Sequence, residues 1–487
     1  MQTVSYNRKT IVALLLAGAF ISILNQTLMI TAIPPIMEEM GITANTGQWL
    51  TTVFMLVNGI MIPVSAFLLE RFTTRQLFVT AMSIFAIGTL ISGIAPNFSF
   101  LLVGRVIQSA GAGVMLPLMQ TVFLLIFPVH KRGSAMGLIG LVISFAPALG
   151  PAISGWVTEH YSWRVLFFII LPIAIVDIII AFFALKNVTE LKKPKLDIPS
   201  VILSSFGFGG LLYGFTSAGN NGWGASLTII SLTVGVVSLF MFILRQLRLQ
   251  HPMLEFRVFT YSLFPLAVVI GIISFMGLIG TETLIPLYMQ NMREFTAFEA
   301  GIALLPGALI SGFMSPITGR IFDRYGARKL AMTGLLIVAV SSIPFTRLDT
   351  ETSLAFMTIM YSIRMFGLSM VMMPISTAAL NQLPKRLIPH GAAMDNTMRQ
   401  VGASVGTAIL VTVMTTTGET AARADIPNPA IYGVNVAFIV ITVLAFVGLL
   451  TSFFVRDSKI SQEEVEKKDL ERLREKQHDN QKIYQKA

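Results

Sequence analysis

The chain has 487 residues, of which 54% are hydrophobic and only 12% are charged, with a mean hydropathy of +0.74. A soluble globular protein carries about twice this charged fraction, so that class is excluded. The absence of cysteine excludes disulfides, thiol catalysis and cysteine-ligated zinc. The net charge of +10 would suit nucleic acid, but the positive residues fall in short segments between apolar blocks, which indicates membrane topology and no nucleic-acid partner.

Fourteen apolar segments are long enough to cross about 30 Å of hydrocarbon as helices. Lipid offers the backbone no hydrogen-bond partners, so we expect an all-α integral membrane protein. The first segment follows Arg8-Lys9, but it is too long for a signal peptide and lacks a small-residue cleavage site, so we expect it to be retained. The expected spans are 11–33, 48–70, 77–95, 100–126, 135–157, 164–185, 198–218, 227–247, 262–288, 298–320, 329–346, 353–378, 393–416 and 432–455.

Positive residues predict the orientation of these spans, because Lys and Arg accumulate in cytoplasmic connections. An even number of spans places both termini on one side. One set of connections carries Arg71, Arg75, Lys131, Arg132, Lys186, Lys192, Lys193, Lys195, Arg245, Arg248, Arg257, Arg324, Arg328, Lys329, Lys385 and Arg386. The alternate set carries only Arg164, Arg293, Arg347 and Arg423. The first set, with both termini, is therefore expected to be cytoplasmic, and the four tryptophans fall at the opposite boundary.

An internal repeat divides the chain. The segment 59–72 and the segment 312–325 share Gly, Met, Pro and Arg at the same places and lie 253 residues apart. That separation holds eight spans, which predicts two parallel six-helix halves and an inserted helix pair. Gly133-Ser-Ala-Met136 matches Gly391-Ala-Ala-Met394 in support. The predicted units are an amino-terminal half at 1–190, an inserted pair at 191–255, a carboxy-terminal half at 256–456 and a charged tail at 457–487.

Each copy of the repeat ends in an acid followed by arginine. An acid at this depth can serve as a latch between helices that breaks as the halves move, and the alternative is a simple topology anchor. The second copy resembles the loop signature of the major facilitator superfamily, whereas the first has Thr73 where that family has glycine. The latch candidates are Glu70, Arg71, Gly319, Asp323, Arg324 and Arg328.

Two further motifs resemble those of drug exporters in this superfamily. Arg105 lies within the fourth span, where a charge is costly and functional by default, unless it reaches the outer interface. The resemblance implies a role in proton transfer. In the fifth span, the small residues and prolines permit close helix packing and resemble the antiporter motif. The motif residues are Gly140, Pro147, Gly150, Pro151 and Gly155.

The resemblance covers the whole chain and extends to the fourteen-helix drug:proton antiporters, in their lincosamide-resistance-like branch. The segment from Asn396 to Ala408 also resembles that branch. Membership implies the major facilitator fold, a bacterial cytoplasmic membrane, a monomer, and the proton gradient as energy source in place of a cofactor. It also implies that protons and lipophilic or cationic drug-like compounds are the partners.

The first span departs from that family. Most members have an aspartate there, whereas this chain has Asn25, which cannot titrate. Burial favours the protonated form of a carboxyl, so intramembrane acids are the remaining proton carriers. We expect Glu282 to be the main one and Asp177 the second. Glu282 could instead be exposed to outer water, and Asp177 could form a static pair or face lipid. Asp395 precedes Arg399 by four residues, so this cytoplasmic-end pair can form on one helix.

Polar and methionine positions within the spans are candidates for a substrate cavity: Asn25, Gln26, Asn58, Gln108, Met115, Met372 and Met373. All five histidines are predicted to lie in loops or the tail, which argues against a histidine relay or a metal site. No nucleotide-binding motif is present, so the chain is not expected to be an ATP-driven enzyme. The sequence favours drug export, with export or flipping of an endogenous lipid-like compound as one alternative, and a non-transporting receptor or scaffold as another.

Overall fold

The computed structural model describes residues 7–189, 191–192, 196–455, 464 and 467. The regular secondary structure of these residues is helical, and fourteen helices are long and apolar enough to cross a membrane, as predicted. Of the predicted tail at 457–487, only 464 and 467 are among the described residues. The helices are α1 (Arg8–Met40), α2 (Ala44–Gly47), α3 (Trp49–Arg71), α4 (Thr74–Gly93), α5 (Phe98–Ile126), α6 (Arg132–His160), α7 (Arg164–Ala184), α8 (Ile198–Asn221), α9 (Ser226–Arg248), α10 (Leu263–Arg293), α11 (Ala297–Tyr325), α12 (Ala327–Ser342), α13 (Leu354–Ser369), α14 (Met372–Asn381), α15 (Ile388–Arg423) and α16 (Pro429–Ser452).

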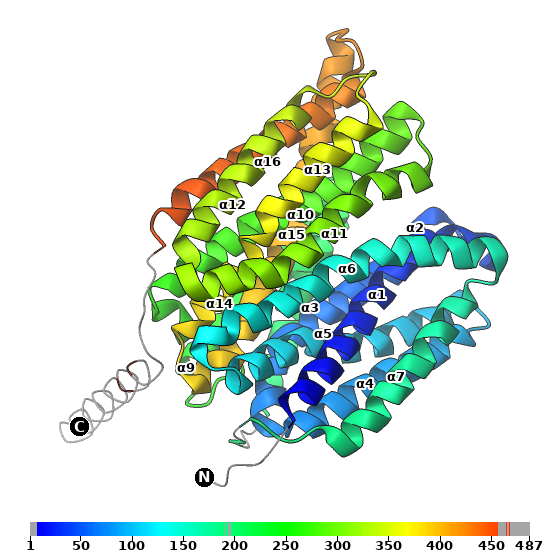
Figure 1. Cartoon of the computed structure of the whole chain (residues 1–487). Coiled ribbons are helices and arrows are strands. Elements are labelled where there is room, and N and C mark those ends of the chain that lie inside the picture. Colours follow the sequence, from blue (N-terminus) through cyan, green and yellow to red (C-terminus); the bar gives the residue numbers. More distant parts are fainter. Residues whose placement is uncertain (1–6, 190, 193–195, 456–463, 465–466, 468–487) are drawn as a thin grey trace.

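The helices form two bundles that lie side by side (Figure 1). One bundle contains α1 to α7, in which the short α2 is not a span. The other contains α10 to α16, in which α13 and α14 together form one span. Together with α8 and α9, this arrangement confirms the predicted fold of two six-helix halves and an inserted pair. We call the face at which α1 begins and α16 ends the inner face, because the positive-charge count predicts it to be cytoplasmic. The opposite face is the outer face.

The twelfth predicted span, 353–378, is broken into α13 and α14. Pro374 lacks an N–H, and its ring conflicts with the carbonyl four residues earlier, at Met370, so the helix is interrupted there. The Thr318 hydroxyl donates to the Ser369 carbonyl at 2.9 Å, which satisfies one backbone group at the break. The predicted span is confirmed as Leu354–Asn381, but it is not one continuous α-helix. The eleventh span similarly ends its α-helix at Ser342 and continues as a 3-10 helix over Ile343–Arg347.

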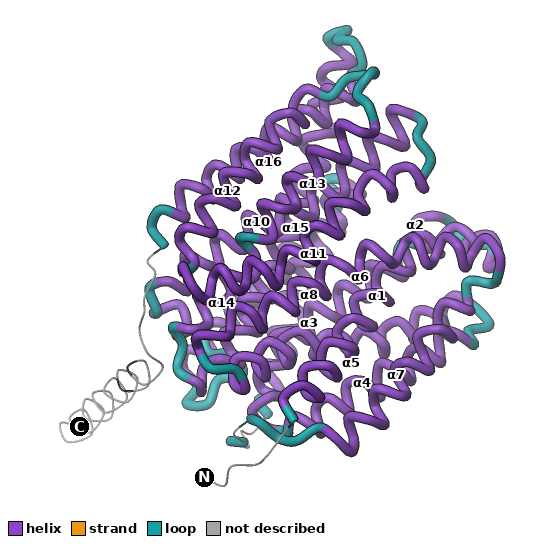
Figure 2. Tube along the Cα trace, in the orientation of Figure 1, coloured by secondary structure: helices purple, strands orange, loops and turns teal. Residues whose placement is uncertain are grey.

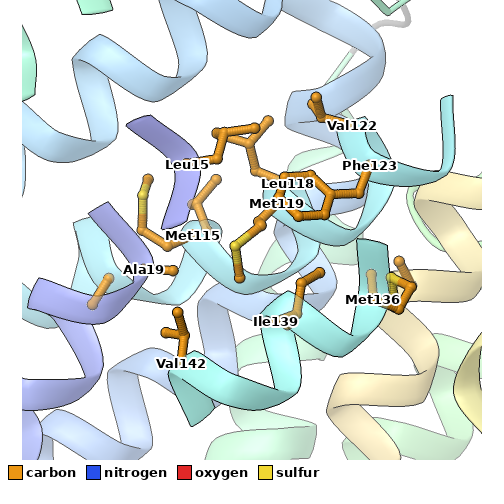
Figure 3. Packing of buried hydrophobic residues seen from close by; sticks show 14 of the residues in the cluster. Leu15, Ala19, Met115, Leu118, Met119, Val122, Phe123, Met136, Ile139 and Val142 are labelled. Carbon is orange, nitrogen blue, oxygen red and sulfur yellow. The ribbon is translucent and has the colours of Figure 1, made fainter. Parts of the chain in front are cut away.

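The core of the first half is packed from aliphatic side chains, methionines and small residues on α1, α5 and α6 (Figure 3). Leu15 and Ala19 of α1 pack near Met115 of α5, and Ile139 and Val142 come from α6. Met115 is only 2% exposed. It therefore lies in the packed core, and this structure does not present it to a substrate cavity as the sequence suggested.

The halves approach closely at the inner face, where glycines let two backbones meet. A Cβ atom on Gly133 of α6 or on Gly319 of α11 would collide with the carbonyl oxygen of the other residue. Towards the outer face, a Cβ atom on Gly155 of α6 or Gly301 of α11 would have no neighbour within 4 Å in the described ranges. The tube view agrees, since the outer ends of α6 and α11 diverge (Figure 2). The conformation is therefore closed at the inner face and opened towards the outer face.

The inserted pair contacts both halves through α8, which packs on α3 of the first half and α15 of the second, while α9 packs on α8. Tyr213 of α8 stacks on Trp49 of α3, with ring centroids 5.6 Å apart. The Trp223 indole, which follows α8, donates to the Thr412 hydroxyl of α15 at 2.8 Å. At the inner end, Asp197 accepts two 2.7 Å hydrogen bonds from the Arg245 guanidinium. These bonds, with the Ser200 hydroxyl, lower the pKa of Asp197 to about 2 against the effect of desolvation.

Candidate functional site

The carboxylate of Asp323 joins the two halves at the inner face. Its Oδ1 accepts from the Gly133 backbone N–H at 2.7 Å, and its Oδ2 accepts from the Ser134 N–H at 2.8 Å and hydroxyl at 2.5 Å. Gly133 and Ser134 form the first turn of α6, where unpaired N–H groups and the helix dipole attract an anion. Asp323 lies in the last turn of α11, so the predicted latch position makes a contact between the halves.

Glu70, the equivalent acid of the first copy, meets side chains in place of a helix terminus. Its Oε1 lies 3.2 Å from Nε2 of His390 and 2.5 Å from Nζ of Lys192. Nδ1 of His390 accepts from the Glu255 N–H at 3.3 Å, so Nε2 carries the hydrogen that is donated to Glu70. His390 is 4% exposed and lies within α15. The prediction that every histidine lies in a loop or the tail was therefore wrong.

The other latch candidates have varied surroundings. Gly319 packs against Gly133 across the two halves. Arg324 lies over the Tyr325 ring, 5.3 Å from its centroid, and the side chains of Arg71 and Arg328 are exposed at the inner face. The sequence had not singled out Arg132, whose Nη1 donates to the Asn381 side chain of the other half at 2.9 Å.

Arg105 is at the centre of a polar network in the first half. It is fully buried, which excludes the alternative that it reaches the outer interface. Its Nη1 donates to Asn25 Oδ1 at 2.7 Å and to Gln108 Oε1 at 2.6 Å, and its guanidinium lies 4.3 Å from the centre of the Phe54 ring. Gln108 in turn donates to the Thr89 hydroxyl at 2.8 Å. Asn25 and Gln108, proposed as cavity residues, are therefore both engaged with Arg105.

A second polar network lies between α10, α12 and α13. The Tyr361 hydroxyl is 3.5 Å from Oε1 of Glu282, which is half-buried. Arg364, one turn along α13, is 2% exposed and donates to the Gly277 carbonyl at 3.0 Å and to the Ser342 hydroxyl. The sequence singled out Glu282 but missed Tyr361 and Arg364. Arg364 carried a usable signal, since it is a charge within a predicted span.

Asp177 lies apart from both networks. Its side chain is buried, with Oδ2 against Gly18 of α1 and close to the Phe78 ring of α4. This position excludes the alternative in which Asp177 faces lipid. Its Oδ2 has no hydrogen-bond partner among the residues that the structure describes. Asp177 thus occupies a seam within the first half and away from the contact between the halves.

Asp395 and Arg399 form the expected pair on α15, with Nε of Arg399 3.3 Å from Oδ1 of Asp395. The pair also reaches the broken span. Ser376 of α14 donates to Asp395 at 2.5 Å, and Nη2 of Arg399 donates to the Met372 carbonyl at 3.1 Å. The pair therefore ties α15 to α14 near the break, in addition to forming the pair on one helix that the sequence suggested.

A small hollow lies between the halves, near the middle of α6 and α11. It is lined by Gly140, Ser144, Ser311, Ser369, Met372 and Met373, among others. Two proposed cavity methionines and the first antiporter-motif glycine thus meet here, and the Ser144 and Ser311 hydroxyls are 3.0 Å apart.

The remaining proposed cavity and antiporter-motif residues lie elsewhere. Gly150 packs against Thr27 of α1, and Gly155 faces open space. Gln26, Asn58, Pro147 and Pro151 are half-buried.

Comparison with known proteins agrees with this architecture. The family model described as Major Facilitator Superfamily matches residues 15–407. The chain belongs to the Major Facilitator Superfamily. It is 58% identical to the uncharacterized MFS-type transporter YcnB of Bacillus subtilis over 93% of this chain and 96% of that protein. It is 44% identical to the lincomycin resistance protein LmrB of Bacillus subtilis over 92% of this chain and 96% of that protein.

Among solved structures, the human organic anion transporter MFSD10 has a TM-score of 0.67 and 13% identity, with 92% of this chain and 100% of that chain covered. At this identity the likeness shows the fold alone. The match to LmrB places the chain in the drug-transporter branch of the Major Facilitator Superfamily, as the sequence motifs indicated. The family match includes the inner latch and both polar networks but ends before α16.

Proposed function

We propose that the protein exports amphipathic, drug-like compounds across the bacterial cytoplasmic membrane in exchange for protons, by alternating access. The observation that carries the proposal is the hydrogen-bonded closure between the halves at one face. Asp323 binds the first turn of α6, Glu70 meets His390, and Arg132 meets Asn381. These contacts would have to break for the inner face to open, which supports a cycle with two orientations of the halves.

The charge distribution supports the direction that we propose. The inner face carries the positive connections, so closure there leaves the substrate path open to the outside. Such a conformation releases an exported compound and takes up a proton from outside. The relative LmrB is named for lincomycin resistance, which supports a drug-like substrate for this chain as well.

Glu282 is the proton carrier in this proposal. Its carboxyl lies within α10 and is half-buried, and Tyr361 is its hydrogen-bonding neighbour. Asp177 is the second candidate, because its Oδ2 is buried and lacks a hydrogen-bond partner within the described part of the chain. Asn25 cannot carry a proton, and it serves Arg105 as a neutral acceptor.

Efflux of ethidium from bacterial cells that lack their own pumps tests the function. Expression of the chain should speed efflux, and a protonophore should abolish the gain. Equal efflux with and without the chain would contradict drug export and favour an endogenous lipid-like substrate. A gain that survives the protonophore would contradict proton coupling.

Replacement of the two acids tests the proton carriers. In proteoliposomes, Glu282→Gln should abolish ethidium/proton exchange and Asp177→Asn should reduce it. Wild-type exchange in both variants would reject this assignment while leaving the export function intact.

A further inference from the structure

The internal repeat places the two polar networks at equivalent positions. The register follows from two helix crossings. In the first half, Gly111 of α5 packs against the Ala81 carbonyl of α4, and in the second half, Gly367 of α13 packs against the Gly334 carbonyl of α12. Ala81 and Gly334 are 253 residues apart, and Gly111 and Gly367 are 256 apart. The same pair of helices therefore crosses at the same point in both halves.

This register superimposes one pair of hydrogen-bonded side chains. Gln108 and Arg364 are 256 residues apart, and Thr89 and Ser342 are 253 apart. Gln108 donates to the Thr89 hydroxyl, and Arg364 donates to the Ser342 hydroxyl. In each half, a side-chain donor on the fourth span of that half (α5 or α13) therefore bonds a hydroxyl on its third span (α4 or α12).

A second contact recurs at nearly the same spacing in the sequence. Arg105 and Tyr361 are 256 residues apart, and Asn25 and Glu282 are 257 apart. Arg105 donates to Asn25, and the Tyr361 hydroxyl lies next to Glu282. Two side-chain contacts are thus preserved with different chemistry, so the networks are two versions of one arrangement.

The chemistry differs in where the charges lie. The first network consists of the cation Arg105, two amides and a hydroxyl, and none of these four groups changes charge near neutral pH. The second contains the acid Glu282, a phenol, the cation Arg364 and a hydroxyl. An acid and a compensating cation are therefore both present only in the second of the two networks.

We propose that Tyr361 and Arg364 are positioning residues for Glu282, and that the charge that changes during transport lies in the second half. This inference rests on the proposed proton-coupled export. When Glu282 is ionised, the Tyr361 O–H donates to its carboxylate. Arg364, one helical turn from Tyr361 on α13, is held by Gly277 and Ser342 and supplies positive charge to the same network of low dielectric. When Glu282 carries a proton, Arg364 remains bonded to Gly277 and Ser342. The proton enters from outer water and leaves to inner water after the halves move.

Substitution Arg364→Gln tests the charge separately from the packing. The first half shows that a buried glutamine at the equivalent position bonds its hydroxyl neighbour, as Gln108 does with Thr89. A purely structural Arg364 would therefore be replaced well by glutamine. We expect pH-driven ethidium efflux in proteoliposomes of the full chain to fall about tenfold or more, the scale of one hydrogen-bonded charge. Arg364→Lys should retain efflux and its pH dependence.

Tyr361→Phe removes only the hydroxyl and leaves the ring in place. We expect it to reduce pH-driven efflux about tenfold while ethidium binding stays within about threefold of wild type. The double variant Arg364→Gln/Glu282→Gln removes both charges and, like Glu282→Gln alone, should show no ethidium/proton exchange. Gel filtration of each variant reports folding, and Tyr361→Phe carries the test if a variant at Arg364 does not fold.

The outcomes separate this inference from the proposed function. If the wild-type protein does not respond to a pH gradient, the proposed function fails and the inference fails with it. If the wild type responds, but Arg364→Gln and Tyr361→Phe keep its rate and pH profile, the inference alone is rejected. Loss of efflux in both Arg364→Gln and Arg364→Lys, with an unchanged Tyr361→Phe, would also reject it, because charge would then not be the relevant property.

Discussion

At the residue scale, the two copies of the repeat use their acids differently. Asp323 is short and lies in the last turn of α11, where both of its oxygens reach the backbone N–H groups of Gly133 and Ser134. Glu70 instead meets His390 and Lys192. The reason lies in the partner helix. Gly391 is the residue that matches Gly133 in the repeat. α15 begins three residues earlier, at Ile388, so Gly391 is already inside the helix and does not offer a free backbone N–H to Glu70.

This difference predicts unequal effects of neutralising the two acids. In Asp323→Asn, the amide NH2 would face a backbone N–H, so one of the two backbone hydrogen bonds is lost together with the charge. Each such charged hydrogen bond contributes about 1.5–3 kcal/mol. We expect the initial rate of ethidium efflux to fall several-fold in Asp323→Asn.

Glu70→Gln is the matched control, because glutamine keeps an oxygen that accepts from His390 or Lys192. Its efflux rate should stay closer to wild type than that of Asp323→Asn. Wild-type rates in both variants would reduce the repeated motif to a trace of gene duplication.

His390 provides a second prediction at this scale. In His390→Phe, the Glu255 N–H and one side of Glu70 lose their partner, and an unsatisfied buried group costs about 1–3 kcal/mol. The purified variant should melt at a lower temperature than wild type, whereas His390→Gln, which keeps a donor and an acceptor, should melt closer to wild type. If His390→Phe melts no lower than His390→Gln, the hydrogen bonds of His390 contribute nothing to the closure.

At the scale of elements, the crossing of α6 and α11 depends on small residues. A Cβ atom on Gly137 would collide with the backbone at Ser315 and Pro316, which cannot rotate away as a side chain can. The backbones of α6 and α11 can therefore approach this closely only if the α6 residues that face α11 have small side chains. The seam loosens towards Gly155, where a Cβ atom meets nothing.

The same substitution at two positions of α6 tests this interpretation. Gly137→Ala should prevent full closure at the inner face and lower the rate of ethidium efflux several-fold. Gly155→Ala, on the outer part of the same helix, should transport as wild type does. Similar rates for the two variants would show that the backbone contact does not limit the conformational cycle.

Some elements were easier to predict from the sequence than others. Hydropathy located all fourteen spans, because lipid-facing helices must be apolar along most of their length. It missed the start of α15, whose first residues are buried against other helices and need not be apolar towards lipid. It also missed the break at Pro374, because prolines occur in several other spans, such as α5 and α7, without dividing them.

At the scale of the whole molecule, the repeat predicted the two halves and the inserted pair, but not the side-chain contacts. Glu70 and His390 are 320 residues apart in the sequence, and no local pattern links them. Arg105 and Asp323 were found through their motifs. Arg364 could have been noticed as a charge within a span, but its equivalence to Gln108 required the structure, because only the helix crossings fix the register.

Alternation between two orientations is the property that unites these observations, and the absence of cysteine makes it testable. The Ser144 and Ser311 hydroxyls lie 3.0 Å apart across the halves, beside the hollow. Replacing both oxygens with sulfur in Ser144→Cys/Ser311→Cys brings the two sulfurs within reach of a bond of about 2.05 Å after a small adjustment. We expect oxidation to link them and to hold the seam shut.

The oxidised double variant should therefore stop ethidium efflux, and a reductant should restore it, whereas each single cysteine variant should be insensitive to oxidant. The pairing itself is measured by the changed gel mobility of protein cleaved between α6 and α11 at an engineered protease site. Efflux at the wild-type rate by fully linked protein would show that transport does not require this seam to open. The disulfide would join α6 of one half to α11 of the other beside the hollow. Wild-type efflux by the linked protein would therefore contradict movement of the two halves as the basis of transport.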